Sequence, residues 1–223
     1  MRRFLILKLQ GPMQAWGGHT FEDFRPSLAF PTRSALLGLL GACLGVRRED
    51  PAGQHDLSQS LRFAVRVDGR YSWLTDYHTV LNARQVGGKV RPHPVVSRRE
   101  YLVPTDQGAG FSVAVWEADN AKVRLPDVVA ALGRPVFTPS LGRRSCPLAR
   151  PLYETEIEAA DAVAALAKVP PSGGPIYSEE GNPELPQLRL RDEPVIARPR
   201  QFASRRVYVH NSMQEGSDVS QQD

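Results

Sequence analysis

Residues Phe30 to Val46 have the sequence FPTRSALLGLLGACLGV, which predicts a helix and guides the interpretation of the chain on either side. Thr32 is a suitable N-terminal cap, and the run that starts at Arg33 is rich in Ala and Leu, two strong helix formers. The apolar part of this stretch is too short to cross a bilayer. We therefore expect a core helix of a globular domain.

Three glycines lie on one face of the predicted helix. Gly38, Gly41 and Gly45 are spaced three and four residues apart. Each costs about 1 kcal/mol relative to Ala inside a helix, and the close approach of another backbone would explain that cost. We therefore expect the helix to lie directly against a sheet, with Gly45 also able to end it.

The first turn of this helix carries positive charge twice. Its free N–H groups are partly positive, and Arg33 adds a full charge at the end where cations are disfavoured. A phosphate held by the N–H groups, Ser34 and Arg33 would resolve this conflict. The alternative is a solvated arginine on an ordinary core helix, and the sequence leaves both interpretations open.

The composition indicates a globular chain in a reducing compartment. The 223 residues are 41% hydrophobic, and the formal net charge is +4, so basic residues matter only where they cluster. Arginine dominates the basic residues, which suits phosphates and base edges, although a GC-rich genome would have the same effect. Cys43 and Cys146 show no metal spacing and no secreted framework, and the N-terminal apolar run is too short for a signal peptide. We expect a cytoplasmic protein without metal, cofactor or membrane span.

The hydrophobic pattern predicts an α+β fold. Residues Leu61 to Val67 alternate strictly, with Leu, Phe and Val on one face and Arg62, Ala64 and Arg66 on the other. The expected order of elements is strand, helix, strand, interrupted hairpin, strand, helix, strand. This βαββαβ order is that of a modified ferredoxin-like or RRM-like domain, with both helices on one sheet face and the other face open. The expected elements are strands at Phe4–Leu9, Leu61–Val67, Tyr71–Val80, Phe111–Trp116 and from Val136–Phe137, with helices at Arg33–Gly45 and Leu125–Gly133.

The rest of the chain is predicted from local composition. Residues Arg47 to Ser58 are expected to form a polar loop, and Tyr153 to Lys168 a helix. Residues Pro170 to Pro186 are rich in Pro, Gly and Ser and predict a loop. Late strands are expected at Leu188–Arg191 and Arg205–Val209, followed by a disordered tail over residues 211–223.

The loop Gly11 to Arg25 carries Gln14 and Trp16 between glycines. A Trp in this setting is able to stack on an unpaired base while the amide bonds a base edge. More commonly, such a Trp fills the rim of the core.

The segment from Tyr77 to Arg99 is basic and contains no Asp or Glu. Its prolines argue against a regular central strand, and its length indicates a binding loop or a protruding hairpin. A basic arm that reaches around a nucleic acid is favoured over a solvated, mobile loop. The basic side chains and histidines are His78, Arg84, Lys89, Arg91, His93, Arg98 and Arg99.

A second basic cluster lies in the stretch SLGRRSCP from Ser140 to Pro147. The turn residues and the side chains of Arg143, Arg144 and Ser145 are suited to hold phosphates. Recognisable catalytic motifs and metal-ligand clusters are absent from the sequence. Tyr77-His78 is the one pair worth testing for RNA cleavage.

Five stretches occur in this order: LKLQGPMQAWGG, FPTRSALLGLLGACLG, LTDYHTVL, SRREYLVPTDQGAGFSVAV and LGRRSCPLARPL. Together they resemble the fifth numbered family of CRISPR-associated proteins in its type I-E form, a subunit of the Cascade surveillance complex. The resemblance runs from Met1 to about Leu152 and continues more weakly to about Val209. Residues Pro170 to Arg200 diverge, which leaves the C-terminal contacts open.

The resemblance implies a non-catalytic subunit that binds the 5′ handle of CRISPR RNA and caps one end of Cascade. It implies contacts with the backbone subunit (CasC) and the large subunit (CasA), and with target DNA only indirectly. It also implies an RRM-like domain over residues 1–148 with a thumb-like hairpin at about 77–103, and a small C-terminal subdomain over 149–210. A type I-C relative is a ribonuclease, so a metal-independent endoribonuclease that processes precursor CRISPR RNA is the alternative, and a free RRM-like regulator is a third hypothesis.

The predicted RNA contacts combine the residue-level arguments with the resemblance. They are Gln14, Trp16, Arg33, Ser34, His78, Arg84, Lys89, Arg91, Arg98, Arg99, Tyr101, Arg143, Arg144 and Ser145.

Overall fold

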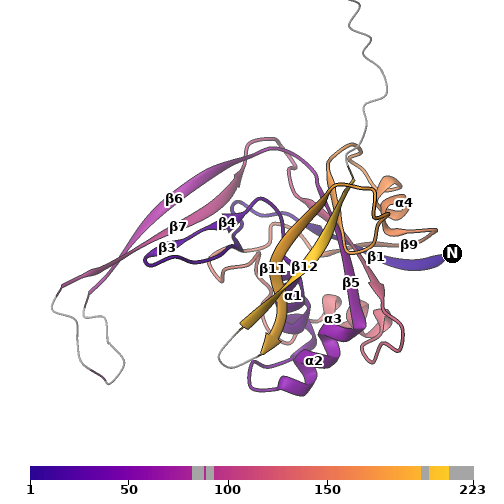
Figure 1. Cartoon of the computed structure of the whole chain (residues 1–223), viewed down its shortest axis with the longest axis horizontal. Coiled ribbons are helices and arrows are strands. Elements are labelled where there is room, and N and C mark those ends of the chain that lie inside the picture. Colours follow the sequence, from indigo (N-terminus) through magenta and orange to yellow (C-terminus); the bar gives the residue numbers. More distant parts are fainter. Residues whose placement is uncertain (82–87, 89–92, 197–200, 211–223) are drawn as a thin grey trace, which may run out of the picture.

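The computed structural model describes residues 1–81, 88, 93–196 and 201–210. Within them the chain is a mixed α+β protein with more strands than helices, built around one large sheet (Figure 1). The segments 82–87, 89–92, 197–200 and 211–223 lie outside the described residues, so the predicted disordered tail and three predicted RNA contacts, Arg84, Lys89 and Arg91, do too.

The central sheet has seven strands in the order β11-β12-β10-β5-β8-β1-β9, and every neighbouring pair is antiparallel. The predicted strand alternation at residues 61–67 is confirmed, with Leu61, Phe63 and Val65 buried in the main core. Residue 148, the expected boundary, lies between β8 and β9 along the chain, and both strands belong to this same sheet, on either side of β1. The seven strands are β1 (Arg2–Leu9), β5 (Leu61–Val67), β8 (Phe111–Glu117), β9 (Tyr153–Ala159), β10 (Ile176–Ser178), β11 (Gln187–Ile196) and β12 (Gln201–His210).

Helix α1 (Arg33–Leu44) forms where the sequence predicts it. The Thr32 side chain accepts a hydrogen bond from the N–H of Ala35, and Gly45 ends the helix with φ +79°, a left-handed conformation that glycine adopts easily. The expectation about the other glycines is wrong in part. Gly38 is exposed with open space around it, while a Cβ on Gly41 would meet the side chain of Leu57 rather than a sheet.

A second helix replaces the predicted polar loop. Helix α2 (Pro51–Ser60) begins with Asp50, whose side chain accepts from the N–H of Gly53, and Pro51 occupies the first turn. Only Leu57 is a buried apolar side chain in α2, which explains why hydrophobic periodicity misses it. Helix α3 (Leu125–Gly133) forms over the predicted residues, and it packs beside α1.

The opposite face of the sheet is not open, which corrects a second expectation. Helix α4 (Ala162–Ala167) covers part of it, and Phe4, Ile6 and Trp116 are buried there. The expected basic character is also absent at Arg66, which is 2% exposed and ion-paired to Asp68 at 2.6 Å. A buried network of Lys8, Arg66, Asp68 and Ser112 therefore ties this face to the chain that follows α4.

The fourth strand of the expected order comes later than predicted. Val136 and Phe137 form no strand and are exposed, although their N–H groups donate to the carbonyls of Cys43 and Ala42 at the end of α1. The strand beside β1 is β9, in the segment predicted to be helical, and the helix there spans only α4. The residues of β9 alternate between Glu and Thr or Ile, a period-two pattern outweighed in the prediction by the Ala-rich run behind it.

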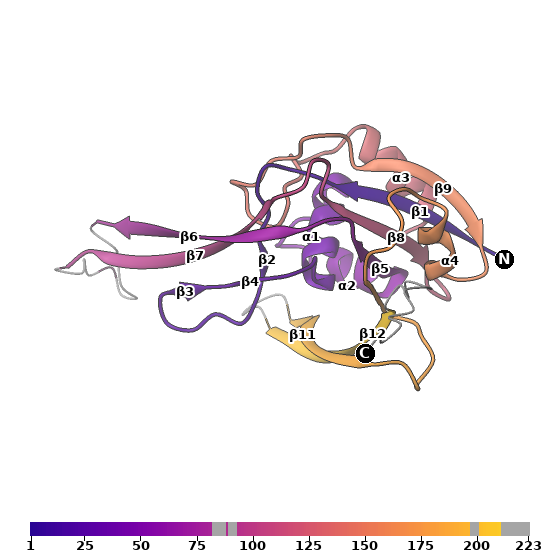
Figure 2. The same ribbon diagram turned by 90° about the horizontal axis from the view of Figure 1, so that it is seen from above.

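A long hairpin projects from the body of the molecule (Figures 1 and 2). Its strands β6 (Tyr71–Val80) and β7 (Val95–Pro104) pair from Tyr71 opposite Pro104 to Val80 opposite Val95. The two-residue strand β3 (Phe24–Arg25) runs parallel beside β7, and β2 (Trp16–Gly17) pairs with β4 (Ser27–Leu28) at the hairpin base.

Candidate nucleic-acid interface

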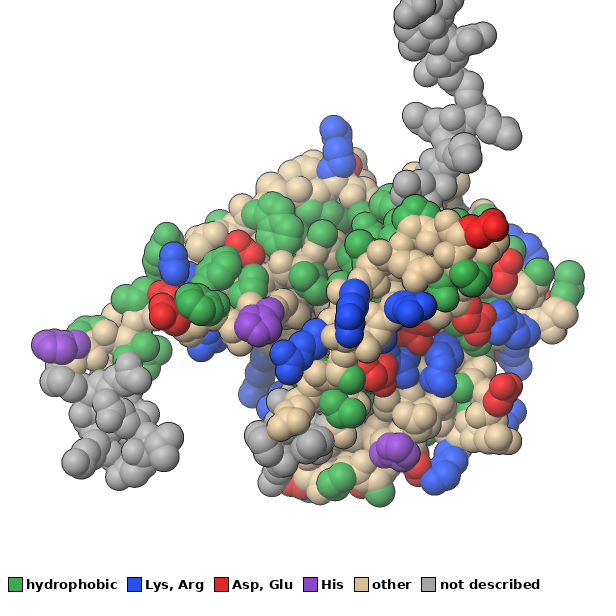
Figure 3. All heavy atoms as spheres, viewed as in Figure 1, with side chains coloured by type: hydrophobic (Ala, Val, Ile, Leu, Met, Phe, Trp, Pro, Cys, Tyr) green, Lys and Arg blue, Asp and Glu red, His purple; other side chains and the backbone are tan. Residues whose placement is uncertain are grey.

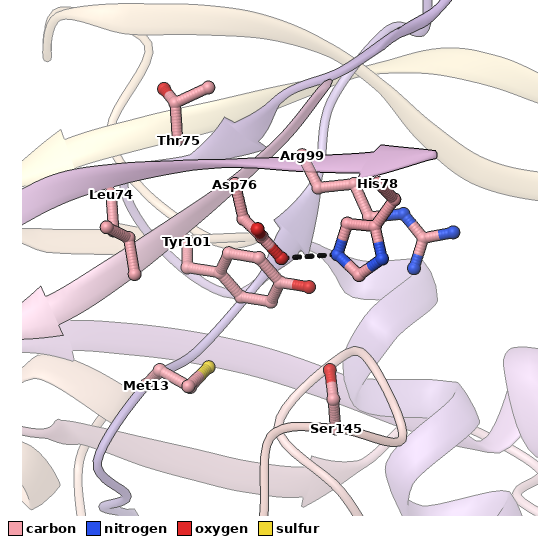
Figure 4. Close-up of a pocket in the computed structure, with 8 residues that line it drawn as sticks. All are labelled: Met13, Leu74, Thr75, Asp76, His78, Arg99, Tyr101 and Ser145. Atoms are coloured by element: carbon pink, nitrogen blue, oxygen red, sulfur yellow. Dashed lines mark ion pairs between the residues drawn. The ribbon is translucent and has the colours of Figure 1, made fainter. Parts of the chain in front are cut away.

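One face of the β6–β7 hairpin borders an open groove. Leu74, Asp76 and His78 project from β6, and Arg99 and Tyr101 project from β7 opposite Asp76 and Leu74. Met13 and Ser145 lie across from the strands in Figure 4, and the cavity has a volume of about 290 Å³. His78 and Asp76 form an ion pair when the imidazole is protonated. The groove therefore has an apolar part, lined by Met13 and Leu74, and a polar part that carries both acidic and basic side chains.

The other face of the hairpin presents aromatic side chains to solvent. Trp73 is 51% exposed and Tyr77 is 67% exposed, and both alternate with the groove residues along β6. Both rings lie on one face of β6, with Thr75 between them, and exposed rings on one strand face are suited to stack on unpaired bases. Sequence reasoning missed Trp73, because alternation in a strand that is exposed on both faces carries no burial signal.

Arg98 lies beside these rings, opposite Tyr77 in the ladder. Its guanidinium pairs with Asp23 at 3.1 Å and lies 5.4 Å from the ring centroid of Phe24. The hydrogen bond from Arg98 holds the pKa of the Asp23 carboxyl below its usual value. Arg98 thus fastens β3 to the hairpin and has only part of its charge available to a ligand.

The loop from Ser140 to Pro147 packs at the base of the hairpin. Arg143 donates to the carbonyls of Glu100 and Arg25, both at 2.8 Å, and its guanidinium lies 4.7 Å from the ring centroid of Tyr101. Gly142 has φ +88°, and a Cβ there would lie 1.8 Å from the carbonyl oxygen of Ala15, so only glycine fits. This packing brings the loop alongside the groove.

The next two residues of that loop remain accessible. Arg144 and Ser145 are exposed, and Arg144 has no acidic partner among the described residues. Ser145 lines the groove together with Arg99 and His78. The predicted contacts that the structure gathers at one place are therefore His78, Arg99, Arg143, Arg144 and Ser145. Tyr101 lies at the same place, but it is only 4% exposed and belongs to the main core, which corrects its prediction as a direct RNA contact.

Gln14 and Trp16 do not reach the surface, which corrects their prediction as RNA contacts. Both are 0% exposed. The backbone of Gln14 pairs with Leu102 of β7, and Trp16 makes an edge-to-face contact with Phe111 at 6.1 Å. The alternative of a Trp that fills the rim of the core is the one that fits this geometry.

Arg33 is also withdrawn from the surface, with 3% exposure. Its guanidinium pairs with Glu179 at 2.8 Å and Glu193 at 2.6 Å, and its N–H donates to Asp192 at 2.7 Å. The interpretation of Arg33 as a phosphate ligand is therefore corrected, because the anions at this helix N-terminus belong to the chain itself. Ser34 lies half-buried beside this cluster, within 3.3 Å of the Thr32 hydroxyl.

Burial governs the titration of several groups near these elements. It raises the pKa of the Glu179 carboxyl, and the guanidinium groups of Arg33 and Arg205 oppose that shift. It raises the pKa of the Cys43 thiol to about 11 and also raises that of Cys146. Both cysteines therefore remain protonated and buried, which does not suit a nucleophile.

Among the described residues, no group of three or more His, Cys, Asp or Glu side chains is arranged to hold a metal ion. Within the described helices, no segment combines the length and hydrophobicity needed to span a bilayer.

Solved structures with the same fold come from CRISPR systems. A structure titled "CRISPR RNA-guided surveillance complex" contains a chain that is 27% identical, with a TM-score of 0.75 over 93% of this chain and 89% of that chain. A structure titled "Crystal structure of Cas protein" matches at 26% identity, with a TM-score of 0.65 over 93% and 94% of the two chains.

The sequence comparisons agree with these structures. "CRISPR system Cascade subunit CasD" of Escherichia coli (strain K12) is 47% identical over 231 aligned residues, which cover 99% of this chain and 100% of that protein. The family described as "CRISPR-associated protein (Cas_Cas5)" matches residues 4–208. Because this match and the near full-length identity include every strand of the central sheet, the chain belongs to the CRISPR-associated Cas5 family.

Proposed function

We propose that this chain is a non-catalytic subunit of a type I-E Cascade complex, in which it binds the 5′ handle of CRISPR RNA and caps one end of the assembly in antiviral defence. The observation that carries this proposal is the 47% identity, over nearly the whole of both chains, to a protein named as a Cascade subunit. The projecting hairpin, with a charged groove on one face and exposed aromatic rings on the other, supports it independently.

We also infer that the fold is a modified ferredoxin-like domain. The four strands β9-β1-β8-β5 are adjacent in that order, and α1 and α3 lie between β1 and β5 and between β8 and β9 along the chain. This is the order expected of a βαββαβ unit. The β6–β7 hairpin is then an excursion between its second and third strands, and the β10–β12 segment extends one edge of its sheet.

In this proposal the hairpin and the loop at its base hold the RNA together. Arg99 and Arg144 attract phosphates, and Trp73 and Tyr77 stack on unpaired bases. Arg143 and Tyr101 act as positioning residues, since their contacts with each other fix the loop against β7. The neighbouring subunits would be CasC along the backbone and CasA, with target DNA reached only through the complex.

A shortened hairpin tests this proposal. Val80 is opposite Val95, so an Asn-Gly turn in place of residues 81–94 would close the ladder without disturbing its register. The body of the protein should fold, because the sheet strands β5 and β8 and their core contacts are untouched. The variant should be co-expressed with the neighbouring gene products, and the RNA that co-purifies should be sequenced.

The expected result is that the wild-type chain carries RNA with one defined 5′ end into a complex, whereas the shortened chain folds and fails to assemble on that RNA. A shortened chain that assembles with the same RNA would contradict the role of the hairpin. A wild-type chain that co-purifies with no Cascade subunit and with unrelated RNAs would support a free RNA-binding regulator instead.

A ribonuclease is the second candidate, and one observation favours it. The Asp76–His78 pair lines the same groove as Arg99 and Ser145, where an oriented imidazole could serve as a general base. We expect His78→Ala to leave processing of precursor RNA by the assembled system unchanged. Metal-free cleavage by the purified chain that disappears in His78→Ala would replace the non-catalytic proposal.

A further inference from the structure

The C-terminal hairpin of β11 and β12 uses its two faces differently. On the inward face, Asp192 pairs with Arg205 at 2.7 Å and accepts from the N–H of Arg33, while Val207 is 2% exposed. Because Leu190 is opposite Arg205 and Glu193 is opposite Ala203, β11 contains one extra residue at this point. This bulge lets consecutive residues Asp192 and Glu193 both reach the cluster around Arg33.

The outward face retains only basic charge. Arg189 lies directly opposite Arg206 in the ladder, and Arg191 follows two residues after Arg189. All three side chains are exposed, and neither Arg189 nor Arg206 has an acidic partner among the described residues. Figure 3 shows Lys and Arg side chains gathered over these strands.

The nearby acids are engaged elsewhere. Both acidic residues of β11 point inward, as described above. Glu179 pairs with Arg33, and Glu180 pairs with Arg2 at 2.6 Å and accepts from the indole N–H of Trp116. Among the described residues, the arginines on the outward face therefore form no ion pair with an acidic side chain.

Repulsion between these neighbouring positive charges lowers the stability of the β11–β12 pairing when no ligand is bound. Residues directly opposite on antiparallel strands have Cα atoms about 4.5–5.5 Å apart, and like charges at that separation destabilise the pairing. Residues two apart on one strand lie roughly 7 Å apart, so the three arginines start from neighbouring backbone positions of the hairpin. A ligand with regularly spaced anions would relieve this repulsion.

We propose that the outward face of β11 and β12 is a second nucleic-acid-binding surface, on which Arg189, Arg191 and Arg206 hold the phosphodiester backbone of a strand. Arginine suits this role because its planar fork bonds two phosphate oxygens at once. The face is separate from the β6–β7 hairpin, which projects from the body while β11 and β12 remain alongside it (Figures 1 and 2).

The test uses the full-length chain and the double variant Arg189→Ala/Arg206→Ala. Binding of three labelled probes is measured over a range of salt concentrations: handle RNA, an unrelated single-stranded DNA and an unrelated duplex DNA. The matched control, Arg48→Ala/Arg134→Ala, removes two exposed arginines from the side of α2 and α3 and gives the same net charge. Thermal unfolding of each variant verifies that the sheet is intact.

The proposal expects the double variant to lower the salt dependence of log K by about 1.4 for a single strand, since each lost phosphate contact removes about 0.7. The control variant should leave it unchanged. A loss confined to handle RNA would identify the strand as the guide, and a loss with either DNA probe would identify a DNA strand. Equal slopes for wild type, variant and control would overturn the proposal.

The charge-reversed variant Arg206→Glu separates nucleic acid from protein as the partner. It should weaken probe binding more than Arg206→Ala does, while the chain still assembles with its protein neighbours. Full probe binding together with failed assembly would show that the face contacts an acidic protein surface, and would overturn the proposal.

Discussion

The molecule contains two β-hairpins with strands of ten residues each, and they differ in what surrounds them. The β6–β7 hairpin projects with both faces accessible along much of its length, and its ion pairs, such as Arg98 with Asp23, are exposed. The β11–β12 hairpin has one face fixed to α1 through Asp192, Arg205 and Glu193. Although their strands have equal lengths, the β6–β7 hairpin depends mainly on its own backbone hydrogen bonds, whereas the β11–β12 hairpin is also held by buried ion pairs.

This difference indicates which residues of each hairpin are free for binding. On β6 and β7, side chains on both faces are available, with Trp73, Tyr77 and Arg98 on one face and charged groove residues such as Asp76 and Arg99 on the other. On β11 and β12, the inward charges stabilise the fold and only the outward arginines are available. The following predictions test this contrast, from the largest expected effect to the smallest.

Removing a charged side chain from each hairpin should show the largest difference in folding stability between the two hairpins. Asp192→Ala removes the carboxylate that pairs with the Arg205 guanidinium and accepts a hydrogen bond from the backbone N–H of Arg33, and breaking such a buried pair costs about 3–5 kcal/mol. Asp76→Ala, on the exposed hairpin, should change the stability little. Urea unfolding of both variants measures the difference, and equal midpoints would remove the contrast.

Removing an exposed ring should have the opposite effect: RNA affinity should fall while folding stability stays nearly unchanged. Trp73→Ala and Tyr77→Ala should each weaken handle-RNA binding by about 1–3 kcal/mol if a base stacks there, with little change in unfolding temperature. Val195→Ala, an exposed apolar position on β11, is the matched control and should leave the affinity unchanged. Titration of labelled RNA measures this effect, and an equal loss in all three variants would contradict a specific stacking surface.

Two arginines should show the same contrast: removing Arg144 should affect RNA binding, and removing Arg33 should affect folding stability. Arg144→Ala should lower the salt dependence of log K for RNA by about 0.7, because one phosphate contact is lost, while the protein remains as stable as wild type. Arg33→Ala should destabilise the fold and leave the slope of the folded fraction unchanged, since Arg33 is buried among carboxylates. A reduced slope for Arg33→Ala would restore it as a phosphate contact.

The smallest effect is expected for the exposed ion pair of the projecting hairpin. Arg98 lowers the pKa of Asp23, so the contribution of this pair to stability is present above the unfolded-state pKa and is lost as the pH falls through the lower folded-state pKa. Asp23→Asn should therefore be indistinguishable from wild type in acid and should differ slightly near neutral pH. Thermal unfolding over a series of pH values measures this, and a difference largest in acid would contradict the assignment.

Local sequence signals predicted several elements well and missed others for identifiable reasons. The cap at Thr32, the left-handed end at Gly45 and the alternation at residues 61–67 depend on neighbours within one turn or one strand, and all three were correct. Helix α2 was missed because it buries one apolar side chain, and β9 because an Ala-rich run follows it. At the site, the grouping of His78, Arg99 and Ser145 depends on a loop that packs from far along the chain.

The sequence by itself determined the core helix, the alternating strands, the basic character of the hairpin and, through its long ordered motifs, the family. The tertiary structure alone decided which arginines are free. Arg33 has the same local features whether it binds a phosphate or a carboxylate, and its partner Glu179 is 146 residues away. Because charges are neutralised by whatever folding brings within a few ångströms, the availability of an arginine is a property of the packed molecule and not of its neighbours in sequence.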